Sequence, residues 1–265
     1  MAVETKEIVK NEVEEKQLEV KPKKSLFKKL KMVLDMLYFM YGMIRLIFKP
    51  NDISPIFVNG SIIREHKAYQ QSLAAFLENK DVKKLVDERY RSPKAHDLIE
   101  LAKLPEGTLG KTFSEHMTKN KLEVVFYPPM DDKVDDEVTY LINRARETHD
   151  IHHVVLSLPA VDIGEMAISG FYLAQNKVPL SAFLIGIGFL YTILREPTRI
   201  EELVNSVIFG WNTGKNAKCV FAVKWEELWE KPLSEIRKEL NIPDISPEDF
   251  FRSVGSKKHL NLQKA

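Results

Sequence analysis

Apolar residues recur at helical spacing along most of this chain, and this periodicity constrains its fold more than any other feature. The segments 62–89, 162–175, 199–211 and 225–240 each carry apolar residues three or four positions apart, which places them on one helical face. A further stripe is formed by Val138, Ile142, Ala145, His149, His153 and Leu156. Short connections separate these segments. The sequence therefore predicts an all-α fold, organised as a single-domain helical bundle.

Composition and charge exclude several classes of protein. The 39 basic and 38 acidic residues nearly cancel, so the net charge gives no reason to expect nucleic acid as a partner. No glycine-rich phosphate-binding motif of the G-x-x-x-x-G-K-[ST] or G-x-G-x-x-G type is present. The single cysteine, Cys219, excludes an internal disulfide framework, fits a reducing compartment and is expected to be a buried free thiol.

The N-terminal region predicts attachment to a membrane surface. Residues 1–24 are charged and lack an apolar run, which is typical of a disordered tail. Residues 25–49 predict an amphipathic, membrane-associating helix whose remaining surface is apolar and whose narrow polar face holds Lys28, Lys31, Asp35, Tyr38, Gly42, Arg45 and Lys49. The longest uncharged run in this helix is too short to span a bilayer. The alternative is that the helix packs against the protein's own core.

A second apolar segment, residues 178–194, contains no charged side chain. Pro179, Gly186 and Gly188 argue against a simple membrane-spanning helix in this segment. We expect a buried helix, or one that lines an apolar tunnel for a long lipid tail. The segment belongs to a helical domain predicted over residues 50–246, and a C-terminal tail is predicted over residues 247–265.

One group of residues has the chemistry of a metal site. His149 and His153 are four positions apart, so both rings project from one helical face and can reach one ion. Asp150 can approach the same ion from the side. Glu165 lies twelve residues beyond His153, which on an unbroken helix would place it about 18 Å further along the axis. Pro159 breaks the helix, so the second helix can fold back and bring Glu165 to the histidines.

The predicted metal ligands are therefore His149, Asp150, His153 and Glu165. Their nitrogen and oxygen donors suit a divalent ion, with Zn²⁺ as the first choice and Fe²⁺ or Mn²⁺ as alternatives. The competing interpretation is that the histidines are hydrogen-bonded core residues and the two carboxylates are ordinary surface groups. The pattern does not assign a catalytic residue.

Other polar residues have more than one interpretation. His152 can be an alternate ligand, a partner of the ligands or simply a buried residue. Arg144 and Arg146 can bind a phosphate or carboxylate near the metal, but we expect them to face solvent and to pair with nearby acids. His96 and Asp97 resemble half of a His-Asp hydrolase site, yet no acidic residue lies at a useful spacing, so an ordinary helix start is expected.

The metal motif resembles that of the helical coenzyme Q biosynthesis family, which includes bacterial lipid-binding homologues. The family pattern H-D-x-x-H-x₁₁-E is similar to the arrangement of His149, Asp150, His153 and Glu165 in this chain. Further similar stretches are Leu104–Gly110, Trp225–Glu226 and Leu240–Ile242. The resemblance covers residues 50–243.

The resemblance implies a metal held by the four motif residues and a hydrophobic tunnel for a polyprenyl quinone precursor. It implies a part in the oxidative decarboxylation of the prenylated ring at carbon one. One alternative is a non-catalytic, lipid-binding scaffold for other quinone biosynthesis enzymes, and a weaker one is a His-Asp type phosphohydrolase. We expect a homo-oligomer peripheral to a membrane, on the cytoplasmic side in a bacterium or on the matrix side of the mitochondrial inner membrane in a eukaryote.

Overall fold

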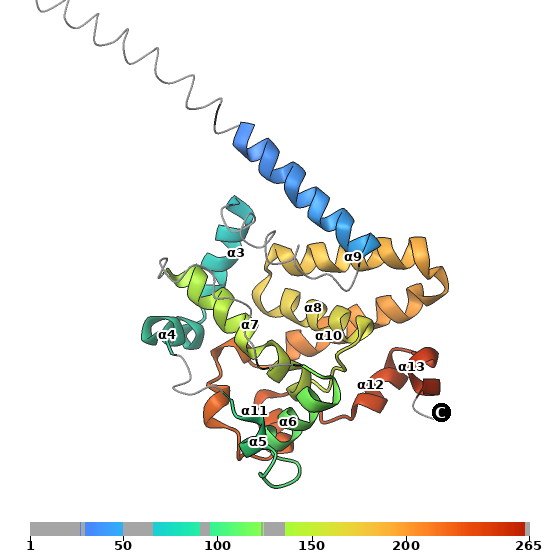
Figure 1. Ribbon diagram of the computed structural model, residues 1–265. Helices are drawn as coiled ribbons and strands as arrows, with labels where there is room; N and C mark the ends of the chain where they lie inside the picture. Colours follow the sequence, from blue (N-terminus) through green and yellow to red (C-terminus); the bar gives the residue numbers. More distant parts are fainter. Residues whose placement is uncertain are drawn as a thin grey trace, which may run out of the picture. The chain divides into compact units, whose positions relative to one another are not determined.

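Helices make up the regular structure of this protein. The computed structural model describes residue 27 and residues 30–49, 66–90, 96–122, 124 and 136–262. They belong to two units, residues 1–62 and 63–265, which we describe separately. Each regular element in the described ranges is a helix, and one isolated antiparallel bridge joins Thr108 to Pro232 (Figure 1). The all-α prediction is confirmed.

The described part of the first unit is a helix over residues 30–48, drawn in blue in Figure 1. This helix lies within the stretch 25–49 where one is expected. Many of its apolar side chains are exposed, among them Leu30, Met32, Leu34, Met36, Leu37, Met40, Ile44 and Phe48. Its association with a membrane stays a prediction. No helix in the described ranges is long and apolar enough to cross a bilayer. The charged tail predicted over residues 1–24 lies outside the described residues.

The second unit is a succession of helices joined by short connections. They are α3 (Lys67–Leu77), α4 (Lys80–Glu88), α5 (Leu98–Leu101), α6 (Leu109–Lys119), α7 (Glu137–Val155), α8 (Asp162–Asn176), α9 (Pro179–Arg195), α10 (Ile200–Asn216), α11 (Leu233–Leu240), α12 (Pro247–Ser253) and α13 (Lys257–Leu262). Helices α8 and α10 follow the periodicity of the sequence closely.

Two of the predicted helices have different boundaries. The stretch 62–89 contains two helices, because the side chain of Asn79 accepts from the backbone amide of Asp81 at 3.0 Å and so starts α4 as a new helix. The stretch 225–240 is helical in the α form only from Leu233 onward. Pro232 precedes that residue, and its ring and missing amide proton prevent a continuous helix across it.

The turn between α7 and α8 confirms the break predicted at Pro159. Asp136 caps the start of α7 by accepting from the Thr139 amide at 2.7 Å, and Ser157, with a φ of +57°, follows its end. The backbone of Gly164 then approaches Pro159 so closely that a Cβ at position 164 would lie 1.8 Å from the Pro159 carbonyl oxygen. This tight turn brings the first residues of α8 back against the end of α7.

Helices α8 and α10 pack with their backbones in contact. A Cβ at Gly210 would lie 1.8 Å from the carbonyl oxygen of Ala167, and one at Gly170 would lie 2.5 Å from that of Val207. Only glycine fits at such distances. The pair therefore forms a fixed support for the residues that α8 carries.

The C-terminal residues contribute to the main hydrophobic core. Phe250 is fully buried, and Phe251 and Val254 are 5% and 1% exposed. The tail predicted over residues 247–265 is therefore wrong as far as Leu262, because α12 and α13 occupy that stretch. The sequence carried a signal for this helix, since Ser246 and Asp249 form a reciprocal capping box at its start.

Helix α9 corresponds to the uncharged segment 178–194, and several of its large apolar side chains are exposed. The side chains of Phe183, Leu190, Ile193 and Leu194 are 44%, 50%, 57% and 65% exposed, whereas Ile185 is buried. The expectation of a buried helix is wrong for these positions, because α8 and α10 already cover each other and α9 packs on them along one side. The tunnel for a lipid tail stays a prediction.

Candidate metal centre

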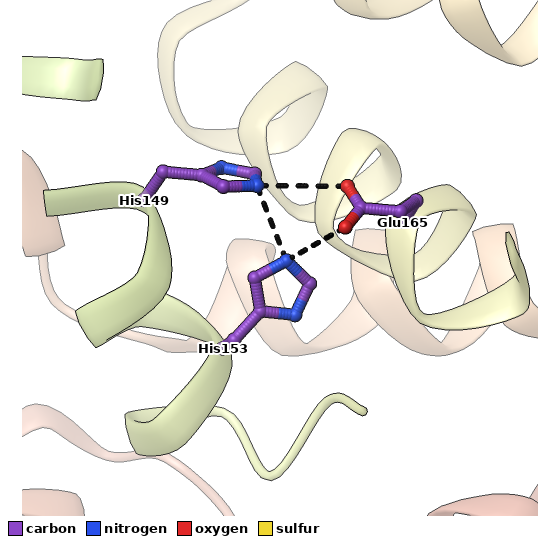
Figure 2. A group of neighbouring side chains, drawn as sticks. All are labelled: His149, His153 and Glu165. Atoms are coloured by element: carbon purple, nitrogen blue, oxygen red, sulfur yellow. Dashed lines mark hydrogen bonds and ion pairs between the residues drawn. The ribbon is translucent and has the colours of Figure 1, made fainter. Parts of the chain in front are cut away.

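Three of the four predicted ligands converge between α7 and α8. His149 and His153 project from α7, one turn apart, and Glu165 projects from the first turn of α8 (Figure 2). Nε2 of His153 lies 3.1 Å from Oε1 of Glu165, and Nε2 of His149 lies 3.5 Å from Oε2. The two Nε2 atoms are 3.2 Å apart. One potential ligand atom from each residue lies within 4.8 Å of the others, as the helix break at Pro159 predicts.

The positions of the protons in this group fit a bound cation. Nδ1 of His153 lies 2.9 Å from the carbonyl oxygen of Leu158, which can only accept, so Nδ1 carries a proton. In the neutral ring, Nε2 then presents a lone pair toward a carboxylate oxygen of Glu165, which also only accepts. Two acceptors so close repel each other unless a positive charge lies between them or on one of them. The residues therefore fit a metal ion at this position.

The site is closed on one side and open on the other. The side chain of His153 is 1% exposed, whereas those of His149 and Glu165 are 34% and 45% exposed. Two imidazoles and one carboxylate supply three protein ligands and no thiolate, a set that leaves coordination positions for water or substrate. The arrangement is thus compatible with an accessible ion.

The carboxylate of Glu165 and the protonated imidazoles beside it stabilise each other's charged forms. Burial raises the pKa of the Glu165 carboxyl, but the charge and hydrogen bonds that His153 and His149 supply when their rings are protonated outweigh this and hold the pKa well below its usual range. Burial lowers the pKa of His149, yet the hydrogen bond to Glu165 and the charge of that carboxylate raise it overall. Glu165 is therefore an anion at neutral pH and available to a cation.

Asp150, the fourth predicted ligand, does not join this group. Its neighbour in sequence is His149, so its side chain leaves α7 about 100° further around the helix axis. It is half-buried, and its carboxylate is not among the ligand atoms that lie within 4.8 Å of one another. Ligation by Asp150 stays a prediction for the metal-bound protein.

A further layer of residues lies behind the three predicted ligands. The hydroxyl oxygen of Tyr172 is 2.7 Å from Nδ1 of His152 and 3.3 Å from Nδ1 of His149. His152 is fully buried, so in this structure it is a partner of Tyr172 and lies outside the ligand group. The sequence prediction missed Tyr172. Its spacing of two helical turns from Glu165 places both on one face of α8, and this is the signal that could have identified it.

His116 of α6 is a second residue that the motif did not reveal. Its ring stacks on that of His153, with the centroids 6.0 Å apart and the planes 20° from parallel. Burial, followed by the charge of His153, lowers the pKa of His116 to about 4, which keeps its ring neutral at physiological pH. No regular spacing in the sequence relates His116 to the motif residues. Its position at the site therefore depends on how α6 packs against α7.

Arg144 differs from its prediction. It was expected to face solvent, but its side chain is 2% exposed and its guanidinium binds Glu226 through both carboxylate oxygens, with Nη2 donating to Oε2 at 2.8 Å. Position 144 lies on the inward face of α7 that also carries Ile151 and His152, which explains its burial. Arg146 is half-buried.

The other His-Asp pair has a structural role. Asp97 caps α5 by accepting from the Ile99 amide at 2.9 Å, so the expected helix start is confirmed. His96 packs edge-on against Trp229, with the ring centroids 4.8 Å apart. Neither residue joins the ligand group, and this weakens the alternative of a His-Asp phosphohydrolase.

The chain is similar to proteins of ubiquinone biosynthesis in sequence. Residues 27–246 match the family described as coenzyme Q (ubiquinone) biosynthesis protein Coq4. The mitochondrial ubiquinone biosynthesis protein COQ4 homologue of Mus musculus is 32% identical over 148 residues, and that of Danio rerio is 30% identical over 164 residues. These alignments cover 55% and 61% of this chain and 54% and 59% of the two relatives. The chain thus spans about half the length of the curated relatives it matches.

The similarity extends to a solved structure. The crystal structure of a candidate ubiquinone biosynthesis protein from Nostoc punctiforme is 29% identical to this chain, with a TM-score of 0.70. The match covers 78% of this chain and 95% of that protein. Because the family match extends over most of the sequence and includes the converging ligands, the chain belongs to the coenzyme Q (ubiquinone) biosynthesis protein Coq4 family, as its metal motif predicts.

Proposed function

We propose that this chain holds a divalent metal ion with His149, His153 and Glu165 and takes part in the oxidative decarboxylation of a polyprenylated hydroxybenzoate at ring carbon one. In that reaction the ring loses its carboxyl group as CO₂ and gains a hydroxyl group, which requires an oxidant such as dioxygen. The observation that carries the proposal is the convergence of two imidazole nitrogens and a carboxylate. Membership of the family supports placing this reaction in the biosynthesis of coenzyme Q (ubiquinone).

The residues of the site have separate roles in this proposal. His149 and His153 would bind the ion through Nε2, and Glu165 would bind it through its carboxylate. The hydrogen bond from Nδ1 of His153 to the Leu158 carbonyl fixes the orientation of that ring. The exposed sides of His149 and Glu165 leave an approach for the polar head group of a substrate. When bound, the ion would supply Lewis-acid or oxygen chemistry.

The identity of the metal separates two versions of this function. Two histidines and a carboxylate suit Zn²⁺, Fe²⁺ and Mn²⁺, and they are also the ligand set of non-haem Fe²⁺ oxygenases. Because the decarboxylation is oxidative, turnover favours a redox-active ion. Zn²⁺ has no redox chemistry, so zinc in the active protein would indicate a Lewis-acid or structural role.

A non-catalytic scaffold that binds lipid is the second candidate. The exposed apolar side chains of α9 and α10 favour it, because such surface is typical of contact with lipid or other proteins: Phe183, Leu190, Ile193, Leu194, Ile208 and Trp211. In this version the ion fastens α7 to α8, and the chain presents a polyprenyl quinone precursor to other quinone biosynthesis enzymes. Self-association and a peripheral position at a membrane belong to both versions. The curated relatives carry the word mitochondrial in their names, which favours the matrix side for a eukaryotic protein.

Metal content and bound prenyl lipid, measured on the same purified sample, test the metal site. The wild-type chain is expected to carry stoichiometric metal. His149→Ala and Glu165→Ala should weaken metal binding by more than the roughly 10–100-fold that loss of an outer partner costs. Glu201→Ala is the matched control, because Glu201 is exposed and, like Glu165, lies in the first turn of a helix. Equal metal affinity in Glu165→Ala and Glu201→Ala would contradict the site.

Turnover of a prenylated hydroxybenzoate then separates enzyme from scaffold. A folded His149→Ala variant that keeps full lipid binding but loses turnover supports the enzyme. If His149→Ala and Glu165→Ala change only the unfolding temperature, while turnover continues, the catalytic role is wrong. A prenyl lipid identified by mass spectrometry in the purified protein supports the apolar tunnel, and failure of every prenyl probe to bind argues against it.

A further inference from the structure

The turn that ends α7 holds the proposed ligand His153 through two contacts with Leu158. The backbone amide of Leu158 donates to the carbonyl oxygen of His153 at 2.9 Å. The carbonyl oxygen of Leu158 lies 2.9 Å from Nδ1 on the ring of His153. The backbone of Leu158 therefore determines where this ring points, and the conformation of the turn determines where Leu158 lies.

Ser157 gives this turn a conformation that favours glycine. Its φ is +57°, in the left-handed region, and its amide donates to the carbonyl oxygen of Val154 at 3.2 Å. Together with the bond from Leu158 to His153, this forms a Schellman motif, in which glycine is the usual residue at the position of Ser157. Another residue keeps such a conformation only where the surrounding structure holds it. Contacts from outside α7 must therefore stabilise the turn.

Arg237 of α11 supplies these contacts. Its Nη2 donates to Oγ of Ser157 at 2.6 Å and to the carbonyl oxygen of Val154 at 3.0 Å. Its Nε donates to the carbonyl oxygen of Val155 at 2.9 Å. The last carbonyl groups of an α-helix lack their usual partner within the helix. One planar guanidinium thus binds two of the last carbonyls of α7 and the serine of the turn.

The side chain of Arg237 is itself fixed in place. It is 11% exposed, and its Nη1 donates to Oδ1 of Asp244 at 2.7 Å. A guanidinium can only donate, so the oxygen of Ser157 accepts from it and uses its own proton for the carbonyl oxygen of Ile245. The turn is therefore bound to residues that lie 80 and 88 positions further along the chain.

We propose that Arg237 is a positioning residue for the metal centre, because it fixes the turn whose Leu158 carbonyl orients the ring of His153. The inference rests on the proposed metal site and adds to it a residue of α11 that lies outside the motif. Arg237 acts through the backbone of the turn and is not itself a ligand. Without it, the ring of His153 is free to leave the orientation in which Nε2 faces Glu165.

Loss of the guanidinium tests this role through the metal. Arg237→Gln removes it, and Arg252→Gln is the matched control, because Arg252 is exposed on α12 and pairs with Glu248. Zn²⁺ affinity of the full chain, measured by competition with a chelator, should fall about 10-fold or more only in Arg237→Gln. Co²⁺ bound in place of Zn²⁺ should show a changed visible absorption spectrum in the same variant, because this spectrum reports the arrangement of the ligands.

Hydrogen exchange separates the turn from a general loss of stability and needs no metal. Leu85→Ala is the control, because Leu85 is 2% exposed in a separate hydrophobic cluster, and its truncation destabilises the fold without touching the turn. This variant should lower the unfolding temperature at least as much as Arg237→Gln. The amide of Leu158 should nevertheless exchange about 10-fold or more faster in Arg237→Gln than in Leu85→Ala.

A milder substitution gives a second variant in case Arg237→Gln does not fold. Arg237→Lys keeps a positive charge beside Asp244. An ammonium group places its donors on a single atom, so it cannot reach all the acceptors that the planar guanidinium binds. Its Zn²⁺ affinity and its rate of Leu158 exchange should lie between those of the wild type and Arg237→Gln.

Two results would overturn the role of Arg237. One is a Leu158 amide that exchanges no faster in the Arg237 variants than in Leu85→Ala, and the other is a Zn²⁺ affinity equal to that of Arg252→Gln. A wild-type chain that binds no metal would overturn the proposed function instead. In that case, exchange of the Leu158 amide still decides whether Arg237 fixes the turn.

Discussion

Arg144 shows how strongly a single charged residue can depend on its partners in this fold. Its side chain is 2% exposed and that of Glu226 is 6% exposed. One guanidinium nitrogen also donates to the carbonyl oxygen of Val223 at 3.0 Å, and the group lies over the ring of Tyr90 at 5.4 Å. A buried charge of this kind is tolerated only while its counter-charge and hydrogen bonds remain.

Removal of one member of this pair should therefore be more harmful than removal of both. Arg144→Met leaves the Glu226 carboxylate buried without its partner, and we expect a loss of about 3–5 kcal/mol in the free energy of unfolding. The double variant Arg144→Met with Glu226→Met should lose much less. Urea unfolding of the two variants measures the difference, and equal losses would show that the pair is not coupled.

The thiol of Cys219 should be unreactive in the folded protein. Burial raises its pKa from 9.0 to about 11. Because the thiolate is the reactive form, a pKa two units higher leaves about 100-fold less of it at any pH below 9. Alkylation by iodoacetamide should be slower by at least this factor in native than in urea-unfolded protein, and its rate should rise with pH until about 11. Cys219 is a free, half-buried cysteine, and equal rates in the two states would contradict the raised pKa of its thiol.

At the scale of single residues, the sequence identifies those site residues whose proximity follows from their spacing along the chain. His149 and His153 share a helical face by spacing alone, and Pro159 supplies the break that Glu165 needs. Tyr172 and His116 were missed, because their contacts depend on how α8 and α6 pack on α7. No local pattern encodes that packing.

Among the helices, the contact between α8 and α10 depends on glycine. A Cβ at Gly210 would lie 1.8 Å from the Ala167 carbonyl oxygen, whereas one at Gly186 on α9 would meet no atom within 4 Å. Gly210→Ala should therefore force the helices apart and destabilise the fold by about 1–3 kcal/mol or more. Gly186→Ala should be neutral or stabilise by up to about 1 kcal/mol, since alanine favours the helix.

The denaturant midpoints of these two variants, measured side by side, check the packing. A Gly210→Ala variant as stable as Gly186→Ala would mean that α8 and α10 lie further apart than described.

The sequence predicts the helices correctly where one helical face is apolar. It predicts their boundaries wrongly where a single residue ends or starts a helix within a continuous apolar spacing. Pro232 delays the start of α11, and Asn79 separates α4 from α3, although the apolar spacing continues across both. The exposed side of α9 was not predictable, because an uncharged segment has no polar face to mark the side that faces solvent.

For the whole molecule, the C-terminal helices should be indispensable to the folded state. Phe250 and Phe251 belong to the main core, and loss of a buried phenylalanine side chain costs about 3–5 kcal/mol. A chain ending at residue 246 loses both, an amount comparable to the total stability of a typical domain. We expect it to be insoluble or to bind hydrophobic dyes.

A chain ending at Leu262 is the control for this truncation, because it retains α12 and α13. Soluble yield and unfolding temperature compare the two. A chain ending at residue 246 that unfolds at the temperature of the full chain would restore the interpretation of this region as a tail.

The position of the three proposed ligands along the chain has a consequence for folding kinetics. His149, His153 and Glu165 lie within one short stretch that reverses at the tight turn of Pro159 and Gly164. Closing a short loop costs little entropy, and contacts of low sequence separation form early. The ligand group can therefore assemble before α10 and α12 pack. An ion that binds at this stage stabilises the transition state, so metal should accelerate folding more than it slows unfolding.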